Sequence, residues 1–213
     1  MRVLQRMVWI TALVALLPSM AMAAGWCGDP PGQNLDYLNP EHRKRLGLVE
    51  RFHFTEEVRT LRRGSSGYLI NDLEYVLNYY PNHHAALDAL SRLAVREGRS
   101  QPHRAEWPIE CRFHWARQVN PEDAMVPLIQ GLHAFRTKKM DAARKYLEES
   151  ASMAPENPEV HYNLGLVLLD LGEYEAAREH ARQAYARGYP LPGLRDMLRR
   201  KGYSVDVPEG EDG

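Results

Sequence analysis

The sequence GLHAFRTKKMDAARKYLEESASMAP, from Gly131 to Pro155, and the sequence GLVLLDLGEYEAAREHARQAYARGY, from Gly165 to Tyr189, repeat one pattern with a period of 34. Glycine inside a helix costs about 1 kcal/mol relative to alanine, so its recurrence indicates a point where two helices cross closely. Proline cannot continue a helix beyond its first turn, so Pro155 marks a turn between units. The residues that define the pattern are Gly131, Ala143, Pro155, Gly165 and Ala177.

This period and these small residues are typical of the tetratricopeptide repeat, in which each unit is a pair of antiparallel helices. The segment HYNLGLVLLDLGEYEAA, residues 161–177, closely resembles the repeat consensus. The first unit departs from it, because Gln130 stands where leucine is usual and Ala134 where tyrosine is usual. The resemblance implies an all-α fold, a right-handed α-solenoid of helix hairpins, and a chain that holds another protein.

Proline also marks the start of an earlier, degenerate unit. Pro81, Pro121 and Pro155 are each followed by Asn or Glu and then by a helix start, and the gaps between them are 40 and 34. The longer gap equals one repeat plus six inserted residues, which we place in 100–108. Residues 83–121 therefore form a third repeat-like unit, and about three stacked units are what a solenoid needs to bury its faces.

The helices are expected at positions that follow from apolar periodicity and breakers. Before the clear units we expect helices over 41–51, 55–64 (capped by Thr55), 67–80, 85–97 and 109–119. The expected organisation is a signal peptide (1–23), an N-terminal arm and helical cap (24–82), the degenerate unit (83–121), two clear units (122–190), a capping helix (191–202) and an acidic disordered tail (203–213).

The N-terminus has the pattern of a secretory signal peptide. Arg2 and Arg6 precede an apolar run of eleven residues, 7–17, which is short for a membrane span. Ala21-Met22-Ala23 supplies a small-x-small cleavage site, so cleavage is expected after Ala23. An uncleaved N-terminal anchor is the alternative. We expect an exported, periplasmic protein with no membrane span once the leader is removed.

Cys27 and Cys111 are the two cysteines of the chain. In an oxidising compartment a lone pair usually forms a disulfide, which here would fasten the N-terminal arm to the repeats. Two free thiols are the alternative. The spacing excludes a Cys-x-x-Cys redox motif, and Trp26 before Cys27 is a poor fit to lipoprotein processing.

Charge argues against a nucleic-acid partner. The 213 residues have a formal net charge of −1, with 27 basic and 28 acidic residues. Without Arg2 and Arg6 the basic residues number 27 − 2 = 25, which gives a net charge of −3. No strong overall field favours nucleic acid or an anionic membrane.

The concave face, formed by the first helix of each unit, is the expected binding surface. An apolar groove with arginines suits an amphipathic helix or an extended apolar peptide. The repeat family's carboxylate clamp uses Lys and Asn, which Leu128, Leu132 and Tyr162 replace, so carboxylate capture is not implied. The alternative is that the chain's own segments fill the groove. The expected partner-binding residues are Arg92, Arg96, Leu128, Leu132, Phe135, Arg136, Tyr162 and Leu166.

No catalytic or metal-binding constellation is present in the sequence. The nine histidines lack a recognised ligand spacing such as His-Glu-x-x-His. There is no Gly-x-Ser-x-Gly elbow and no glycine-rich phosphate loop with lysine. We therefore expect no enzymatic activity, no metal and no cofactor.

Beyond the repeat, the chain resembles a group of small exported bacterial tetratricopeptide proteins. The shared features are Cys27-Gly28, His53-Phe54-Thr55, Pro81-Asn82-His83-His84 and Tyr162-Asn163-Leu164-Gly165-Leu166. The resemblance implies a periplasmic adaptor that binds a protein or peptide in its concave face, such as a subunit of an envelope assembly. The alternative is a structural or accessory protein with a filled groove, which makes its contacts through the tail or the convex face.

Overall fold

The computed structural model of the chain describes residues 26–65 and 67–206, and within them every regular element is a helix. The expected all-α fold is confirmed. The expected helices are present, and their ends differ from the expected ends by no more than two residues, except for the helix expected over 55–64. The helices are η1 (His42–Arg45), α1 (Leu46–His53), α2 (Glu56–Arg59), α3 (Leu69–Tyr79), α4 (His84–Glu97), α5 (Ile109–Val119), α6 (Met125–Arg136), α7 (Met140–Met153), α8 (Pro158–Asp170), α9 (Tyr174–Ala186) and α10 (Gly193–Arg200).

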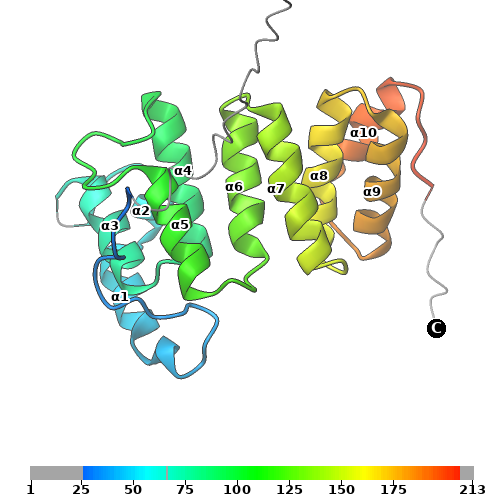
Figure 1. Cartoon of the computed structure of the whole chain (residues 1–213). Helices are drawn as coiled ribbons and strands as arrows, with labels where there is room; N and C mark the ends of the chain where they lie inside the picture. The colour runs from blue at the N-terminus through cyan, green and yellow to red at the C-terminus, as the bar shows by residue number, and fades with distance from the viewer. Residues whose placement is uncertain (1–25, 66, 207–213) are drawn as a thin grey trace, which may run out of the picture.

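Helix hairpins stack side by side into an α-solenoid, with α6–α7 and α8–α9 as the two clear units (Figure 1). The recurring glycine is where the two helices of a hairpin meet. A Cβ atom added at Gly131 on α6 would lie 2.6 Å from Cγ of Leu147 on α7. Ala143, one turn earlier on α7, is fully buried. A larger residue at position 131 would therefore force the hairpin apart.

In the second unit, the side chain that packs against the recurring glycine comes from α10 and not from the second helix of the hairpin. A Cβ atom added at Gly165 would lie 2.5 Å from Cδ2 of Leu194 on α10. The position equivalent to Leu147, one repeat period later, is the small Ala181, which leaves space for Leu194. Leu194 in turn lies one period after Val160 on α8, and both are fully buried. Helix α10 thus occupies the place of a first helix in a shortened final unit.

The apolar interior has two parts that meet at α6. Val126 and Ile129 belong to the core formed with the N-terminal helices, whereas Leu128 belongs to the core of the clear units. Beyond α10, Tyr203 packs on Tyr174 with ring centroids 5.3 Å apart. Tyr203 lies within the expected tail, so this described part of the tail lies on the second core. The expected leader and residues 207–213 lie outside the described residues.

The helix expected over 55–64 is wrong: α2 is a single turn. Leu61 has a φ of 58°, in the left-handed region, and no right-handed helix can continue through it. The carboxylate of Asp72 then accepts a hydrogen bond from the backbone N–H of Ser65 (2.7 Å) and holds the returning chain. Thr55 precedes α2 in an extended conformation, but its side chain makes no capping hydrogen bond.

Candidate interaction surface

A groove of about 360 Å³ opens on the face formed by the first helices α4, α6 and α8. Its floor is the apolar stripe of α6, which repeats at the i, i+3, i+4 and i+7 positions that share one helix face. Leu128 is 1% exposed, whereas Leu132 is half-buried and presents part of its side chain to the groove. The lining residues are His84, Ala85, Asp88, Met125, Leu128, Ile129, Leu132, Arg136 and Glu159.

The cations of the groove are already paired by the chain. The carboxylate of Asp88 lies 2.8 Å from Nε of Arg92, one turn along α4, and 2.8 Å from Nη1 of Arg136 on α6. The two arginines and Asp88 therefore form a closed ion cluster along one wall. Such a partly exposed cluster orients the walls of the groove more than it stabilises the fold.

Glu159, on the opposite wall, is a charged lining residue that no other described side chain pairs with. Its carboxylate has no hydrogen-bond or ion-pair partner among the residues that the structure describes. The side chain of Glu159 is exposed, but desolvation by neighbouring atoms, and then the negative charge of Asp88, raise its pKa above the ordinary value. Burial, followed by the charge of Glu159, also raises the pKa of Tyr189 to about 12. Glu159 is thus the lining carboxylate that has no direct partner in the described part of the chain.

The N-terminal end of the concave face is covered by the chain itself. Arg92 donates a second hydrogen bond, through Nη2, to the carbonyl oxygen of Arg59 (2.9 Å). Arg96 donates to the carbonyl oxygen of Leu61 (2.9 Å). Both carbonyls lie at the end of α2, so these two sequence-predicted arginines fasten α2 to α4 and are removed from the open groove.

The C-terminal end is covered by aromatic packing. Tyr162 is 7% exposed, and its ring lies 4.4 Å from the ring of Tyr189. Leu166 and Phe135 are half-buried and pack against the second core rather than lining the groove. The structure therefore brings three of the sequence-predicted residues together in the open part: Leu128, Leu132 and Arg136.

The Pro-Asn-His-His turn fastens the N-terminal arm to the start of the groove. Asn82, which is fully buried, donates to the carboxylates of Asp36 (2.8 Å) and Asp123 (2.9 Å). His84 donates through Nε2 to Asp123 (2.8 Å), and Asn120 donates to Asp36 (3.0 Å). Buried polar groups need such partners, so this network fixes the arm against the turns before α4 and α6.

Helix caps repeat with the period of the prolines, a signal that the sequence analysis missed. His83 accepts from the backbone N–H of Ala86 at the start of α4, and Asp123 accepts from that of Met125 at the start of α6. Asn157 accepts at the start of α8. The spacings between these caps, 40 and 34, equal those between the prolines. Each capping side chain satisfies helix N–H groups that would otherwise lack a partner.

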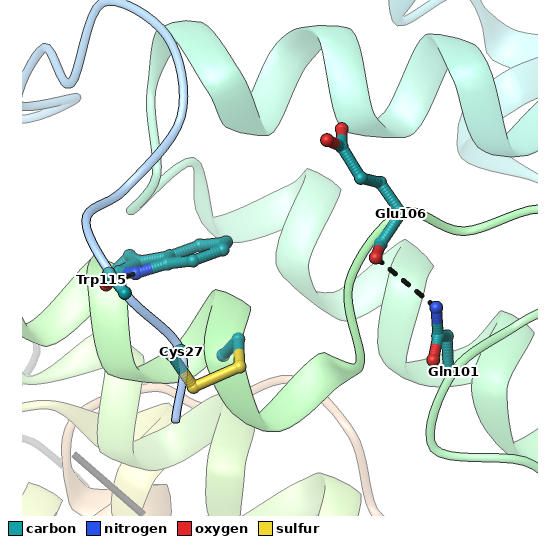
Figure 2. Close-up of a disulfide and its surroundings, with 6 residues drawn as sticks. Cys27, Gln101, Glu106 and Trp115 are labelled. Carbon is teal, nitrogen blue, oxygen red and sulfur yellow. Dashed lines mark hydrogen bonds between the residues drawn. A yellow bond between two sulfur atoms is a disulfide. The ribbon is translucent and has the colours of Figure 1, made fainter. Parts of the chain in front are cut away.

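The disulfide between Cys27 and Cys111 is present, as expected. Figure 2 shows Trp115 beside the arm that carries Cys27, and the indole N–H of Trp115 donates to the carbonyl oxygen of Gly28 (3.0 Å). The ring of Trp107 lies edge-on to that of Trp115, with the ring centroids 5.3 Å apart. Because Trp107 belongs to the insertion over 100–108, the insertion contributes one side of the apolar enclosure of the disulfide, and Trp115 of α5 contributes another.

His161 and His180 contact each other rather than a metal-ligand set. His161 lies with its Nε2 2.7 Å from the carbonyl oxygen of Pro155, and its Nδ1 lies 3.0 Å from Nδ1 of His180. Across residues 26–65 and 67–206, no group of three His, Cys, Asp or Glu side chains is arranged to hold a metal ion. In the same residues no helix has the length and apolar character needed to cross a bilayer.

Comparison with known proteins agrees with this architecture. A family model described as tetratricopeptide repeat matches residues 112–158 and 130–191. The chain is also similar to a solved structure described as "Functional Characterization of Pseudomonas Aeruginosa pilF", with 19% sequence identity and a TM-score of 0.52. The match covers 76% of this chain and 70% of that one. At this identity the likeness shows the fold alone. No curated protein matches the chain.

Proposed function

We propose that this tetratricopeptide-repeat protein holds a peptide segment of another protein in the groove between α4, α6 and α8. Tetratricopeptide repeats are protein-interaction modules, and the groove combines an apolar floor with a charge that the chain leaves unmatched. The segment is apolar where it meets Met125 and Leu132, and it carries a lysine or arginine that pairs with Glu159. The observation that carries this proposal is the self-paired Asp88–Arg136 wall facing an unpaired carboxylate.

The protein acts outside the cytosol, as an adaptor in an envelope assembly. Support comes from the leader pattern of residues 1–23 and from the disulfide, which suits an oxidising compartment. The periplasm is the proposed location. In this role the repeats serve as a rigid holder and carry out no chemistry of their own.

A second cavity favours contact through the convex side as the competing function. It measures about 450 Å³ and lies between α5, α6 and α7. Phe113, Ala142 and Tyr146 give it an apolar lining. The two cavities lie on different helix faces, so substitutions can separate the two functions.

Leu132→Asp is expected to weaken peptide binding by at least about tenfold, because a carboxylate on the apolar floor would have to be desolvated. Peptides would be selected from a displayed library on the mature protein, and their affinities measured by fluorescence anisotropy. Ala142→Asp places a carboxylate in the convex cavity instead, and it is expected to leave the affinity for the peptide unchanged. The reverse pattern, with circular dichroism showing both variants folded, would assign binding to the convex side.

Glu159 is expected to make the affinity for a cationic peptide depend on pH. Since the pKa of Glu159 is raised in the free protein, binding a cation near it must release a proton as the pH falls. Affinity should therefore weaken as the pH is lowered from about 7 towards the ordinary carboxyl range near about 4.5. Glu159→Gln should lower the affinity at neutral pH and remove most of the dependence. If the pH profile of Glu159→Gln is unchanged, a group other than Glu159 pairs with the cation of the peptide.

A further inference from the structure

Helix α1 has apolar residues on its outer face as well as on its inner one. Leu46 and Val49 are buried against the N-terminal core. On the other side Leu48 is 59% exposed and Phe52 is 57% exposed, one helical turn apart. Large apolar side chains standing out from a helix in this way indicate a surface that meets a partner.

Basic residues surround the exposed leucine. Lys44 and Arg45 end η1, four and three residues before Leu48, and Arg51 follows Leu48 by three residues on α1. Within the described part of the chain, Arg45 and Arg51 have no ion-pair partner. The outer face of α1 is therefore a pair of apolar side chains within a ring of cations.

The acidic residues of the same segment are already engaged. Glu50 lies 3.1 Å from Nε2 of the buried His83, and this hydrogen bond lowers the pKa of Glu50. Glu41 pairs with Lys44. Residues 41–53 contain four lysine or arginine residues and two glutamates, so their net charge is positive, although the net charge of the whole chain is −1.

Aromatic residues extend the patch onto α3. Tyr75 is 39% exposed, and the ring of His53 stacks on it at 3.7 Å. His53 is held by the buried carboxylate of Asp72 at 2.9 Å. A groove of about 250 Å³ joins these rings to Leu48 and Phe52. Tyrosine has an apolar ring and a polar tip, a combination enriched at membrane–water interfaces.

We propose that this face, formed by Lys44, Arg45, Leu48, Arg51, Phe52 and Tyr75, docks on an anionic lipid surface. Apolar side chains that project from a short basic helix suit the headgroup region of a bilayer, and the cations suit its negative surface charge. Figure 1 shows η1 and α1 at the end of the molecule opposite α10, so docking there leaves the central groove accessible.

The test is co-sedimentation of the mature protein with vesicles of phosphatidylcholine alone or mixed with phosphatidylglycerol. Binding is expected only to the anionic vesicles. It should be lost when the ionic strength is raised from about 0.1 M to about 1 M, which shortens the Debye length from about 10 Å to about 3 Å. Each cation near an anionic surface contributes about a fivefold change in partition, so Arg45→Ala/Arg51→Ala should lower binding about 25-fold. Phe52→Ser should also lower it.

Matched variants at the other end of the molecule control for charge and apolarity in general. Arg199→Ala/Arg200→Ala removes two cations from α10, and Leu191→Ser removes a leucine that is 52% exposed. Both are expected to bind vesicles like the unaltered protein. Three results would overturn the proposal: no binding to anionic vesicles, equal binding to neutral ones, or equal losses in the α1 and α10 variants. A binding partner that is an acidic peptide would give the first of these.

Discussion

Reduction of the disulfide between Cys27 and Cys111 is expected to lower the free energy of unfolding by about 4 kcal/mol. The bridge joins residues that are 84 positions apart, so it restricts a large part of the unfolded chain. In the chain-entropy model the loss grows with the length of the closed loop. It is a large fraction of the stability of an ordinary domain.

The folded state should survive this reduction, because other contacts hold the arm. The backbone N–H groups of Gln33 and Leu35 donate to the carbonyl oxygens of Asn78 (2.8 Å) and Tyr79 (2.9 Å). The arm also keeps the hydrogen bonds between Asp36 and Asn82. Urea unfolding with and without reductant measures the difference, and intact mass confirms the redox state. The variant Cys27→Ala/Cys111→Ala should have the lower stability and no response to reductant. Equal midpoints for the oxidised and reduced protein would contradict the expectation.

Replacing Arg112 by methionine is expected to cost about 3–5 kcal/mol, because it leaves Glu74 buried without a cation. Arg112 is 2% exposed, and its Nη2 donates to Glu74 (2.9 Å) while its Nη1 donates to Asn78 (2.6 Å). Burial lowers the pKa of Arg112, and the charge of Glu74 acts in the opposite direction. The pair joins α3 to α5 at the side of the disulfide.

A double substitution separates loss of the pair from general disruption. Glu74→Gln/Arg112→Met removes both charges, while the amide can still accept from the backbone N–H of Glu106, as Glu74 does at 2.9 Å. Its stability should recover much of the loss, since removing both partners of a buried pair is often nearly neutral. Urea unfolding of the two single variants and the double variant gives the coupling energy. A double variant as unstable as the sum of the singles would contradict this account of Arg112.

The repeats could be predicted from the sequence because their information is local and periodic. Gly131 and Gly165, one period apart, mark the helix crossings, and the expected helix over 109–119 agrees with α5. The one-turn α2 could not be predicted. Its end depends on the left-handed backbone of Leu61, and no residue type at that position signals it.

The position of the groove floor on α6 was predictable from the sequence, but the pairing of the charged residues around it was not. Counting inward-facing positions selects Arg92 and Arg96, yet both are used by carbonyl groups at the end of α2, which is distant in sequence. The same count places Glu159 on the inner face, but it was left out of the expected binding residues because an isolated acid near a helix start is usually a solvated or capping residue. Its significance depends on Asp88 being paired by Arg136, a contact between two units.

Site-specific photo-crosslinking from within the groove, in the producing cell, shows directly whether the groove holds a second protein. A photoreactive amino acid is placed at Leu132, and a second protein carries it at Ala142 in the convex cavity. An adduct of defined mass is expected from position 132, mapped to an apolar segment with a lysine or arginine, and none is expected from position 142. Adducts from position 142 with none from position 132 would contradict it.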